Sequence, residues 1–198
     1  MRTMLPIATN LIYKVNLIKP YQKEKEFIQQ FFTGKASHIL EDGGKSSRTL
    51  ESQLFKYPEM QELCFDVLVY ADIFWVKYGL DTYYEPCFNT VWANEHRKGH
   101  RTLSHFHSGA PLVAVYYCEV PESSGRIYFE NPLEYHMCHE PRRNPVVEFV
   151  DVKAGDLLIF PGFLKHGTEA SGTDEPRTVI AFNFTYQNRK PISIPIPH

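Results

Sequence analysis

The chain lacks an excess of charge of either sign, and this absence narrows the range of its partners. Its 198 residues carry 21 Lys and Arg against 23 Asp and Glu, which gives a net charge of −2. Proteins that bind nucleic acids or membrane surfaces without specificity usually present a basic face or a polybasic run. We therefore expect no non-specific nucleic-acid binding and no membrane attachment.

Long apolar runs and paired cysteines are also missing. The apolar stretch 4–8 is too short for a signal peptide and is broken by Pro6, and no segment has the apolar length of a membrane span. No Cys-x-x-Cys pair is present, and reduced thiols are favoured over a disulfide framework or a zinc knuckle by the irregular spacing of Cys64, Cys87, Cys118 and Cys138. We expect a soluble, cytoplasmic protein, and a homodimer stays open.

The order of the elements predicts an α+β protein that is mainly β. An apolar run at 11–15 predicts an early strand, residues 19–32 and 58–78 have helical patterns, and 35–50 has the composition of a loop. After Gly79 the strand-like runs are 88–94, 112–118, 126–129, 146–152, 156–160 and 177–186. Runs 112–118 and 126–129 predict a hairpin across a short turn.

Short strands with no helix between them predict a jelly-roll core with the helices confined to the N-terminal part. We expect a single domain over residues 1–198. Within it, 1–85 forms a strand and a helical buttress, 86–186 forms the core and 187–198 forms a tail.

Two histidines separated by one residue, His105 and His107, form the strongest candidate site. Side chains at positions i and i+2 of an extended strand point to the same face, so both imidazoles can reach one metal ion. The alternative is that the two side chains are exposed or hydrogen-bonded to their neighbours.

A third histidine follows a strand-like run farther along the chain. His166 comes after the run 156–160 and a Pro-Gly stop at 161–162, which is typical of a strand that leaves its sheet at the rim. In a jelly roll this position can lie beside the earlier pair. Three histidines would then occupy one face of a metal and leave the opposite face for substrates.

Arg177 begins the last strand-like run. Positions 177, 179, 181 and 183 share one face of that run. Positions 178, 180, 182 and 184 share the other, which has the composition of a packing face. An arginine that points into a barrel needs an anion, and its planar fork suits a carboxylate. The alternative is an exposed arginine at a strand end.

The order His105-x-His107, His166 and Arg177 resembles the 2-oxoglutarate- and Fe(II)-dependent oxygenases, which hold iron and co-substrate in a double-stranded β-helix. A narrower similarity is to a bacterial and phage group of these proteins with a His-x-His…His pattern. It covers most of residues 86–186 and includes Trp92-x-Asn94, the stretches 99–107, 115–117, 125–132 and 155–161, His166 and Phe182-Asn183.

The resemblance implies an enzyme that hydroxylates an unidentified substrate and releases succinate and CO₂, and the near-zero charge leaves small metabolites, peptides and nucleobases all open as substrates. Fe(II) would be bound by His105, His107 and His166, and Arg177 would bind the far carboxylate of 2-oxoglutarate. Asn94, Tyr117 and Asn183 are candidates for orienting the co-substrate.

One position departs from the superfamily pattern. The second ligand is usually a carboxylate two residues after the first histidine, and here it is His107. Three neutral ligands leave the metal site more positive by one unit of charge. The alternative is that only His105 and His166 bind the metal, with water completing the face.

A second resemblance, to the cupins, rests on the spacing of residues 99–107 and 155–166. It implies a three-histidine metal enzyme or binding protein without 2-oxoglutarate. The expected cupin glutamate is missing at Pro111 and Leu112, and Arg177 has no role in that pattern. A third alternative is a structural or sugar-binding jelly roll with incidental histidines.

The remaining candidates have weaker signals. His96 and His100 flank a basic turn; contact with substrate is one interpretation, and a surface position is favoured over it. Loops 131–145 and 41–47 have the composition of active-site lids or of ordinary surface loops. The cluster 136–139 lacks a second ligand pair and does not predict zinc binding.

Overall fold

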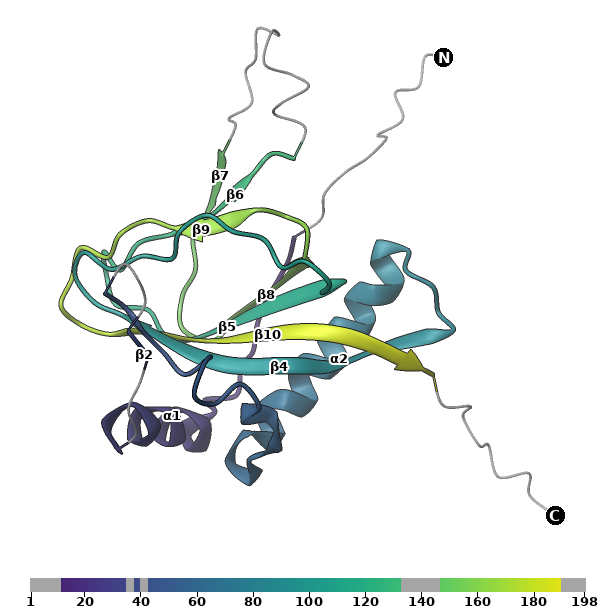
Figure 1. Cartoon of the computed structure of the whole chain (residues 1–198), viewed down its shortest axis with the longest axis horizontal. Helices are drawn as coiled ribbons and strands as arrows, with labels where there is room; N and C mark the ends of the chain where they lie inside the picture. Colours follow the sequence, from purple (N-terminus) through teal and green to yellow (C-terminus); the bar gives the residue numbers. More distant parts are fainter. Residues whose placement is uncertain (1–11, 35–37, 40–42, 133–146, 190–198) are drawn as a thin grey trace, which may run out of the picture.

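The computed structural model describes residues 12–34, 38–39, 43–132 and 147–189, which form two antiparallel sheets (Figure 1). In spatial order, the larger sheet contains β1 (Tyr13–Asn16), β8 (Asp156–Pro161), β5 (Leu112–Glu119), β10 (Arg177–Asn188), β4 (Tyr84–His96), β3 (Lys45–Ser46) and β2 (His38–Ile39). The smaller sheet contains β7 (Val147–Val150), β6 (Ile127–Glu130) and β9 (His166–Thr168). This arrangement confirms the predicted fold class, a mainly β jelly roll.

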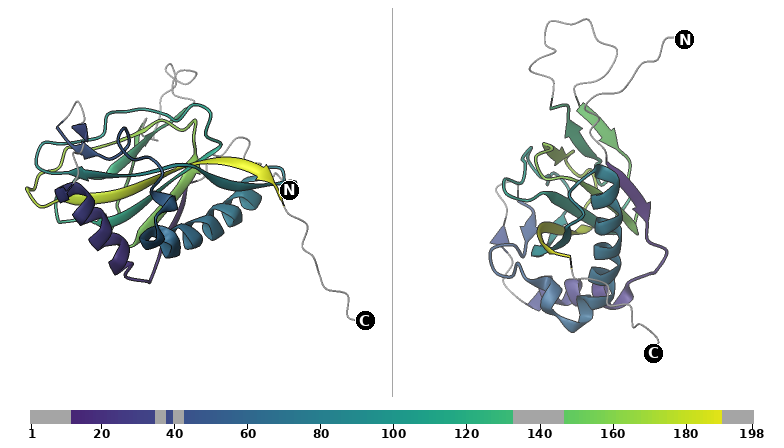
Figure 2. Two further views of the ribbon diagram at one scale, coloured as in Figure 1. Left: turned by 60° about the horizontal axis from the view of Figure 1, so that its bottom comes forward. Right: turned by 90° about the vertical axis from the view of Figure 1, so that its right-hand side faces the viewer.

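Two helices, α1 (Gln22–Gly34) and α2 (Gln61–Tyr78), cover one face of the larger sheet (Figure 2). The 3₁₀ turns η1 (Leu54–Lys56) and η2 (Pro58–Met60) lead into α2. Helix α2 ends where Gly79 adopts a left-handed backbone with a φ of 84°. The predicted N-terminal buttress is thus present, whereas the domain limits at 85 and 186 stay predictions.

The alternation along β10 separates two apolar layers. Ile180, Phe182 and Phe184 pack against the helices, whereas Val179 packs between the two sheets. Each fully buried side chain of this size contributes about 1.5–3 kcal/mol. The predicted division of this strand into two faces is confirmed, and it leaves the inner face for a cavity.

The expected hairpin of residues 112–118 and 126–129 is wrong. Strand β5 pairs with β8 and β10 in the larger sheet, while β6 pairs with β7 and β9 in the smaller one. The turn between β5 and β6 therefore carries the chain from one sheet to the other, as jelly-roll connections do. Turn composition signals a reversal but not which sheet receives the next strand.

The loop expected at 35–50 is also partly wrong. Strands β2 and β3 pair with each other, and β3 extends the larger sheet beyond β4. Both strands are only two residues long, so they leave no pattern in the sequence. The short strand β9, which carries His166, was not expected either.

The absences expected from the sequence can be examined in the described part of the chain. No helix there combines the length and apolarity needed to cross a bilayer. Cys64, Cys87 and Cys118 are free thiols, in agreement with the expectation of reduced cysteines. Cys138 lies outside the described residues.

Gly162 marks a close approach of two backbone segments. A Cβ at this position would lie 1.9 Å from the carbonyl oxygen of Ala110 and 3.0 Å from that of His107. Rotation of a side chain cannot relieve a clash with a backbone oxygen. The segment before β5 can therefore lie against the end of β8 only if residue 162 is glycine.

We expect Gly162→Ala to lower the free energy of unfolding by about 1–3 kcal/mol, because the added methyl overpacks this contact. Urea unfolding measures the loss. Gly99→Ala is the comparison: a Cβ there meets nothing within 4 Å, so its loss of stability measures the strain of an alanine at a φ of +81° and not overpacking. No measurable loss for Gly162→Ala would mean that the backbone relaxes around the methyl.

Candidate metal centre

Three histidines from distant parts of the chain converge on one point. The candidate ligand atoms of His105, His107 and His166 all lie within 4.8 Å of one another. His105 and His166 exchange two backbone hydrogen bonds of 2.9 Å, and the amide of His107 donates to the carbonyl of Gly162 at 2.8 Å. Backbone pairing therefore brings the three imidazoles together.

The expected regular strand at 105–107 is not present. His105 forms an isolated bridge with His166, and His107 follows in irregular backbone. Pairing across to the start of β9, and not i/i+2 geometry alone, aligns the rings. The stacked rings of His107 and His166 have an interplanar angle of 8°.

Hydrogen bonds to the backbone set the tautomers of two of the rings. The Nδ1 atom of His105 lies 2.8 Å from the carbonyl of Leu103, and that of His166 lies 2.9 Å from the carbonyl of Leu164. A carbonyl can only accept, so Nδ1 carries the hydrogen in both rings. The lone pair of each Nε2 is then available to a metal, as is usual for metal-bound histidines.

Burial keeps the cluster neutral. It lowers the pKa of His107 to about 4 and that of His166 to about 3, with a further contribution from the neighbouring His105. Burial likewise lowers the pKa of His105. Neutral imidazole is the form that binds metals.

One atom of the cluster has no partner among the residues that the structure describes. The Nε2 of His107 is buried and makes no hydrogen bond with them, although an unsatisfied buried polar group usually costs about 1–3 kcal/mol. A divalent first-row metal would satisfy it together with the other two imidazoles. The residues present therefore fit a metal ion.

The histidines open into a cavity between the two sheets. It is lined by Trp92, Asn94, His96, Thr102, His105, His107, Val113, Val115, Tyr117, Ile127, His166, Gly167, Thr168, Arg177, Val179 and Ala181. No Asp or Glu belongs to this lining among the described residues. The cavity thus combines aliphatic walls, the histidine cluster and one buried cation.

Arg177 lies in this cavity and is only 1% exposed. Its guanidinium donates to the carbonyl of Gly125 at 2.9 Å and to the hydroxyl of Thr168 at 3.1 Å, and it contacts Nδ1 of His96 at 3.3 Å. These contacts orient the guanidinium. The predicted inward direction of Arg177 agrees with the structure, and its role stays a proposal.

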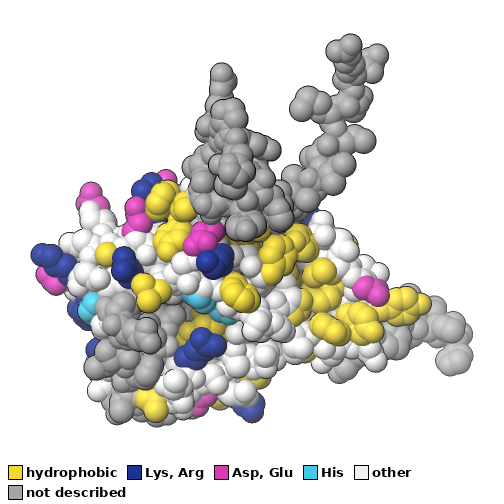
Figure 3. Space-filling view, turned by 45° about the horizontal axis from the view of Figure 1, so that its top comes forward, with side chains coloured by type: hydrophobic (Ala, Val, Ile, Leu, Met, Phe, Trp, Pro, Cys, Tyr) yellow, Lys and Arg dark blue, Asp and Glu magenta, His cyan; other side chains and the backbone are white. Residues whose placement is uncertain are grey.

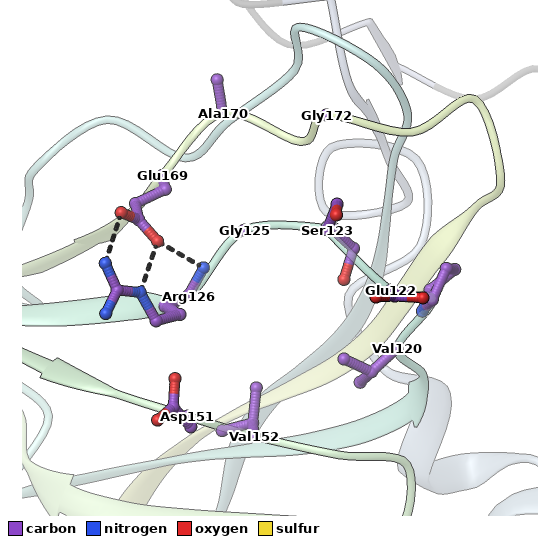
Figure 4. Close-up of a pocket in the computed structure, with 12 residues that line it drawn as sticks. Val120, Glu122, Ser123, Gly125, Arg126, Asp151, Val152, Glu169, Ala170 and Gly172 are labelled. Carbon is purple, nitrogen blue, oxygen red and sulfur yellow. Dashed lines mark hydrogen bonds and ion pairs between the residues drawn. The ribbon is translucent and has the colours of Figure 1, made fainter.

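The loop behind Arg177 is held by an ion pair. Arg126 donates to Glu169 from its amide at 3.0 Å and from its guanidinium at 2.8 and 2.9 Å (Figure 4). Arg126 lowers the pKa of Glu169 to about 2, so the pair stays charged. Gly125 precedes Arg126, and the fixed loop presents its carbonyl to Arg177.

The three candidates for orienting a co-substrate occupy different places. Tyr117 and Asn94 line the cavity, and burial raises the pKa of Tyr117, which keeps its hydroxyl protonated. Among the described residues, the Oδ1 of Asn94 and that of Asn183 are buried without a hydrogen-bond partner. Asn183 is not among the residues that line the cavity, but it is near enough to His107 to raise the pKa of that ring against the larger lowering effect of burial.

His96 was expected at the surface and is instead 1% exposed. It lies directly opposite Arg177 in the pairing of β4 with β10. Trp92, Asn94 and His96 alternate along β4 and all line the cavity. Extending the Trp92-x-Asn94 motif by two residues would have found this histidine, but the charged turn that follows suggested the surface.

Other sequence candidates do not join this site in the described residues. The loop 131–145 and the cluster 136–139 lie wholly or largely outside the described ranges. Of the second candidate lid, 41–47, the described part contains β3, which pairs with β4. Thr102 and Thr168 line the cavity, although no motif singled them out.

The buried histidines predict how stability depends on pH in the metal-free protein. Their pKa values are below the ordinary value of about 6.5, so the folded state binds fewer protons than the unfolded chain. Stability is fully present above pH ~6.5 and falls as the pH is lowered toward 4, by about 1.4 kcal/mol per pH unit for each of His107 and His166. Urea unfolding at pH 7 and pH 5 measures this slope.

His166→Gln should flatten that pH slope, whereas replacement of His100, which lies outside the cluster, should leave it unchanged. An unaltered slope in His166→Gln would contradict a neutral, buried His166.

The segment that contains this site is similar to a known protein family. Residues 90–183 match the model of a protein family described as "Putative 2OG-Fe(II) oxygenase". That range contains the histidine cluster and Arg177. A search of curated proteins finds no significant match.

Several solved structures share the fold at low identity. The alpha ketoglutarate dependent epimerase SnoN from nogalamycin biosynthesis is 15% identical, with a TM-score of 0.66 over 89% of this chain and 78% of its own. HygX from Streptomyces hygroscopicus, solved with nickel, 2-oxoglutarate and hygromycin B, is 13% identical, with a TM-score of 0.60 over 89% and 83%. A prolyl hydroxylase from Trichoplax adhaerens, solved with a hypoxia inducible factor peptide, is 12% identical, with a TM-score of 0.63 over 89% and 84%.

Identities this low establish the fold and leave the substrate open. The resemblance seen in the sequence is confirmed: over residues 90–183 this chain matches the 2OG-Fe(II) oxygenase family, and its jelly roll is the fold of those proteins.

Proposed function

We propose that this protein is an Fe(II)- and 2-oxoglutarate-dependent oxygenase that hydroxylates a small-molecule substrate and releases succinate and CO₂. The observation that carries the proposal is the shared cavity of three neutral histidines and a buried arginine. The family match over the same residues supports it.

His105, His107 and His166 would hold the metal through Nε2. When bound, Fe(II) with 2-oxoglutarate supplies the activation of O₂ that oxidises a C–H bond. The protein's own contribution is to keep the three imidazoles neutral by burial, and to orient the rings of His105 and His166 through backbone carbonyls so that Nε2 is free of hydrogen. The apolar walls formed by Val113, Val115 and other lining residues exclude water from the reaction.

Arg177 would bind the carboxylate of 2-oxoglutarate that is distant from the metal. Its contacts to Gly125, Thr168 and His96 fix the guanidinium plane before the co-substrate arrives. The protonated hydroxyl of Tyr117 can donate a further hydrogen bond to that carboxylate. Preorganised charge of this kind lowers the cost of ordering an anion.

The cupin alternative has less support. It gives no role to Arg177, which the protein buries and orients in the same cavity as the histidines. Burial of an arginine is costly unless its donors are hydrogen-bonded and an anion balances its charge. The oxygenase proposal accounts for the arginine and the histidines together.

The kind of substrate is supported by analogy alone. SnoN was solved with nogalamycin RO and HygX with hygromycin B, so the fold admits small molecules beside 2-oxoglutarate. A small-molecule substrate is accordingly part of the proposal. The cytoplasmic location and the homodimer stay predictions.

Anaerobic titration of the Fe(II)-loaded protein with 2-oxoglutarate tests the proposed function. We expect a visible metal-to-ligand charge-transfer band. In Arg177→Ala the 2-oxoglutarate concentration for half-saturation should rise by about 10- to 100-fold, since a charge-assisted hydrogen bond contributes about 1.5–3 kcal/mol. Arg177→Lys should recover part of this loss.

Circular dichroism and iron content control for misfolding of the Arg177 variants. Absence of the band in the wild-type protein, or an unchanged titration in Arg177→Ala, would exclude the oxygenase and favour the cupin alternative.

His107→Ala tests whether the unusual second ligand binds the metal. We expect iron affinity to fall at least tenfold, because loss of even an outer-shell partner of a metal typically costs about 10- to 100-fold. His107→Asp should retain iron, since it places a carboxylate where the superfamily has one. His100→Ala is the control for general effects of losing a histidine, and undiminished iron binding in His107→Ala would remove His107 from the metal shell.

A further inference from the structure

An exposed arginine lies beside the histidine cluster. The guanidinium carbon of Arg48 is 5.1 Å from the ring centroid of Trp92, in a cation–π contact. Trp92 in turn stacks on His107, with centroids 6.1 Å apart and an interplanar angle of 27°. Burial is the main cause of the lowered pKa values of His105 and His107, but the charge of Arg48 also contributes to both. Arg48 therefore lies close enough to act on the proposed metal ligands.

Arg48 differs from the other cations near this edge of the sheet. Lys45 and Arg97 both pair with Glu95, at 3.6 and 3.0 Å. Within the described ranges Arg48 forms no ion pair, and its side chain is exposed. The contact with Trp92 positions the guanidinium without neutralising it, because an aromatic face carries no net charge.

Arg48 is not among the residues that line the cavity, but it packs on Trp92, which is, and the combined charge of the cavity and Arg48 favours an additional anion. The three histidines are neutral, and no carboxylate lines the cavity in the described residues. With the proposed metal and co-substrate bound, the two negative charges of 2-oxoglutarate cancel the two positive charges of a divalent metal. Arg177 and Arg48 then remain as positive charges, and Arg48 is the one that solvent reaches.

The surroundings of the histidines are also apolar. Phe106, which lies between His105 and His107 in the sequence, is 55% exposed. Leu103 and Phe163 are also exposed, and they precede His105 and His166 by two and three residues. The space-filling view shows histidine side chains between basic ones, with apolar side chains beside them (Figure 3). A surface of this composition beside the histidine cluster suits a ligand with an apolar body and one charged group.

We propose that Arg48 binds an anionic group of the primary substrate, which therefore carries a carboxylate, phosphate or sulfonate group on an apolar body. This inference rests on the proposed oxygenase function and names the substrate class of the same site. Trp92 acts as a positioning residue that holds the guanidinium of Arg48 beside the histidine cluster.

The binding test uses the anaerobic Fe(II)- and 2-oxoglutarate-loaded protein, which cannot turn over. The probes are phenylacetate, phenyl phosphate and the uncharged phenylacetamide, and the readout is Trp fluorescence. A Trp92→Phe protein identifies the part of the signal that comes from Trp92. We expect the better of the two anions to bind at least tenfold more tightly than the amide, and the ranking of the two anions tells carboxylate from phosphate.

Arg48→Gln should abolish the preference for the anions, and Arg48→Lys should keep part of it. Lys56→Gln is the matched control, because Lys56 is also a cation over an aromatic ring, 6.0 Å from that of Phe55, but belongs to η1. It should bind all three probes like the wild type.

The charge-transfer band, recorded in the same samples, separates the two proposals. No band in the wild type overturns the proposed function. If the band is present but the wild type shows no anion preference, or the preference persists in Arg48→Gln, the inference about Arg48 is overturned. Loss of the band in Arg48→Gln would likewise overturn it, since Arg48 would then serve the co-substrate.

Discussion

Backbone pairing between the segment 105–107 and the rim of the β8–β9 connection is the constraint on which the site depends. The two hydrogen bonds between His105 and His166, and the one from His107 to Gly162, join regions some sixty residues apart. They bring three imidazoles together at a buried position where their charged forms are disfavoured. The candidate metal site is consequently formed by the fold itself and does not require a ligand to assemble it.

A second constraint acts at Arg177. A guanidinium at 1% exposure must have its donors satisfied, and a carbonyl, a hydroxyl and an imidazole contact it. The carbonyl comes from a loop that the Arg126–Glu169 pair fixes (Figure 4). The partners of Arg177 therefore come from both sheets, so the cavity depends on the sheets keeping their relative position.

The sequence predicted the parts of this arrangement that follow from local periodicity. Alternation along 177–184 was enough to assign Arg177 to an inner face and Phe182 to a packing face, because a strand has a period of two. It was not enough for the 112–118 and 126–129 runs, since a turn does not reveal which sheet receives the next strand. His96 was misplaced for a related reason: its burial depends on lying opposite Arg177, and that pairing links residues 81 positions apart.

The charge at position 107 affects Arg48. The superfamily usually has a carboxylate there and this chain has His107, and Arg48 forms no ion pair within the described residues. Both side chains pack against Trp92. The ring centroid of His107 lies 6.1 Å from that of Trp92, and the guanidinium carbon of Arg48 lies 5.1 Å from it. A carboxylate at position 107 would attract the guanidinium and reduce its charge toward solvent. A neutral imidazole instead leaves Arg48 repelled by any metal held there, so its most favourable partner is an anion arriving from outside. His107, the residue that departs most from the superfamily pattern, would in this way favour an anionic substrate at Arg48.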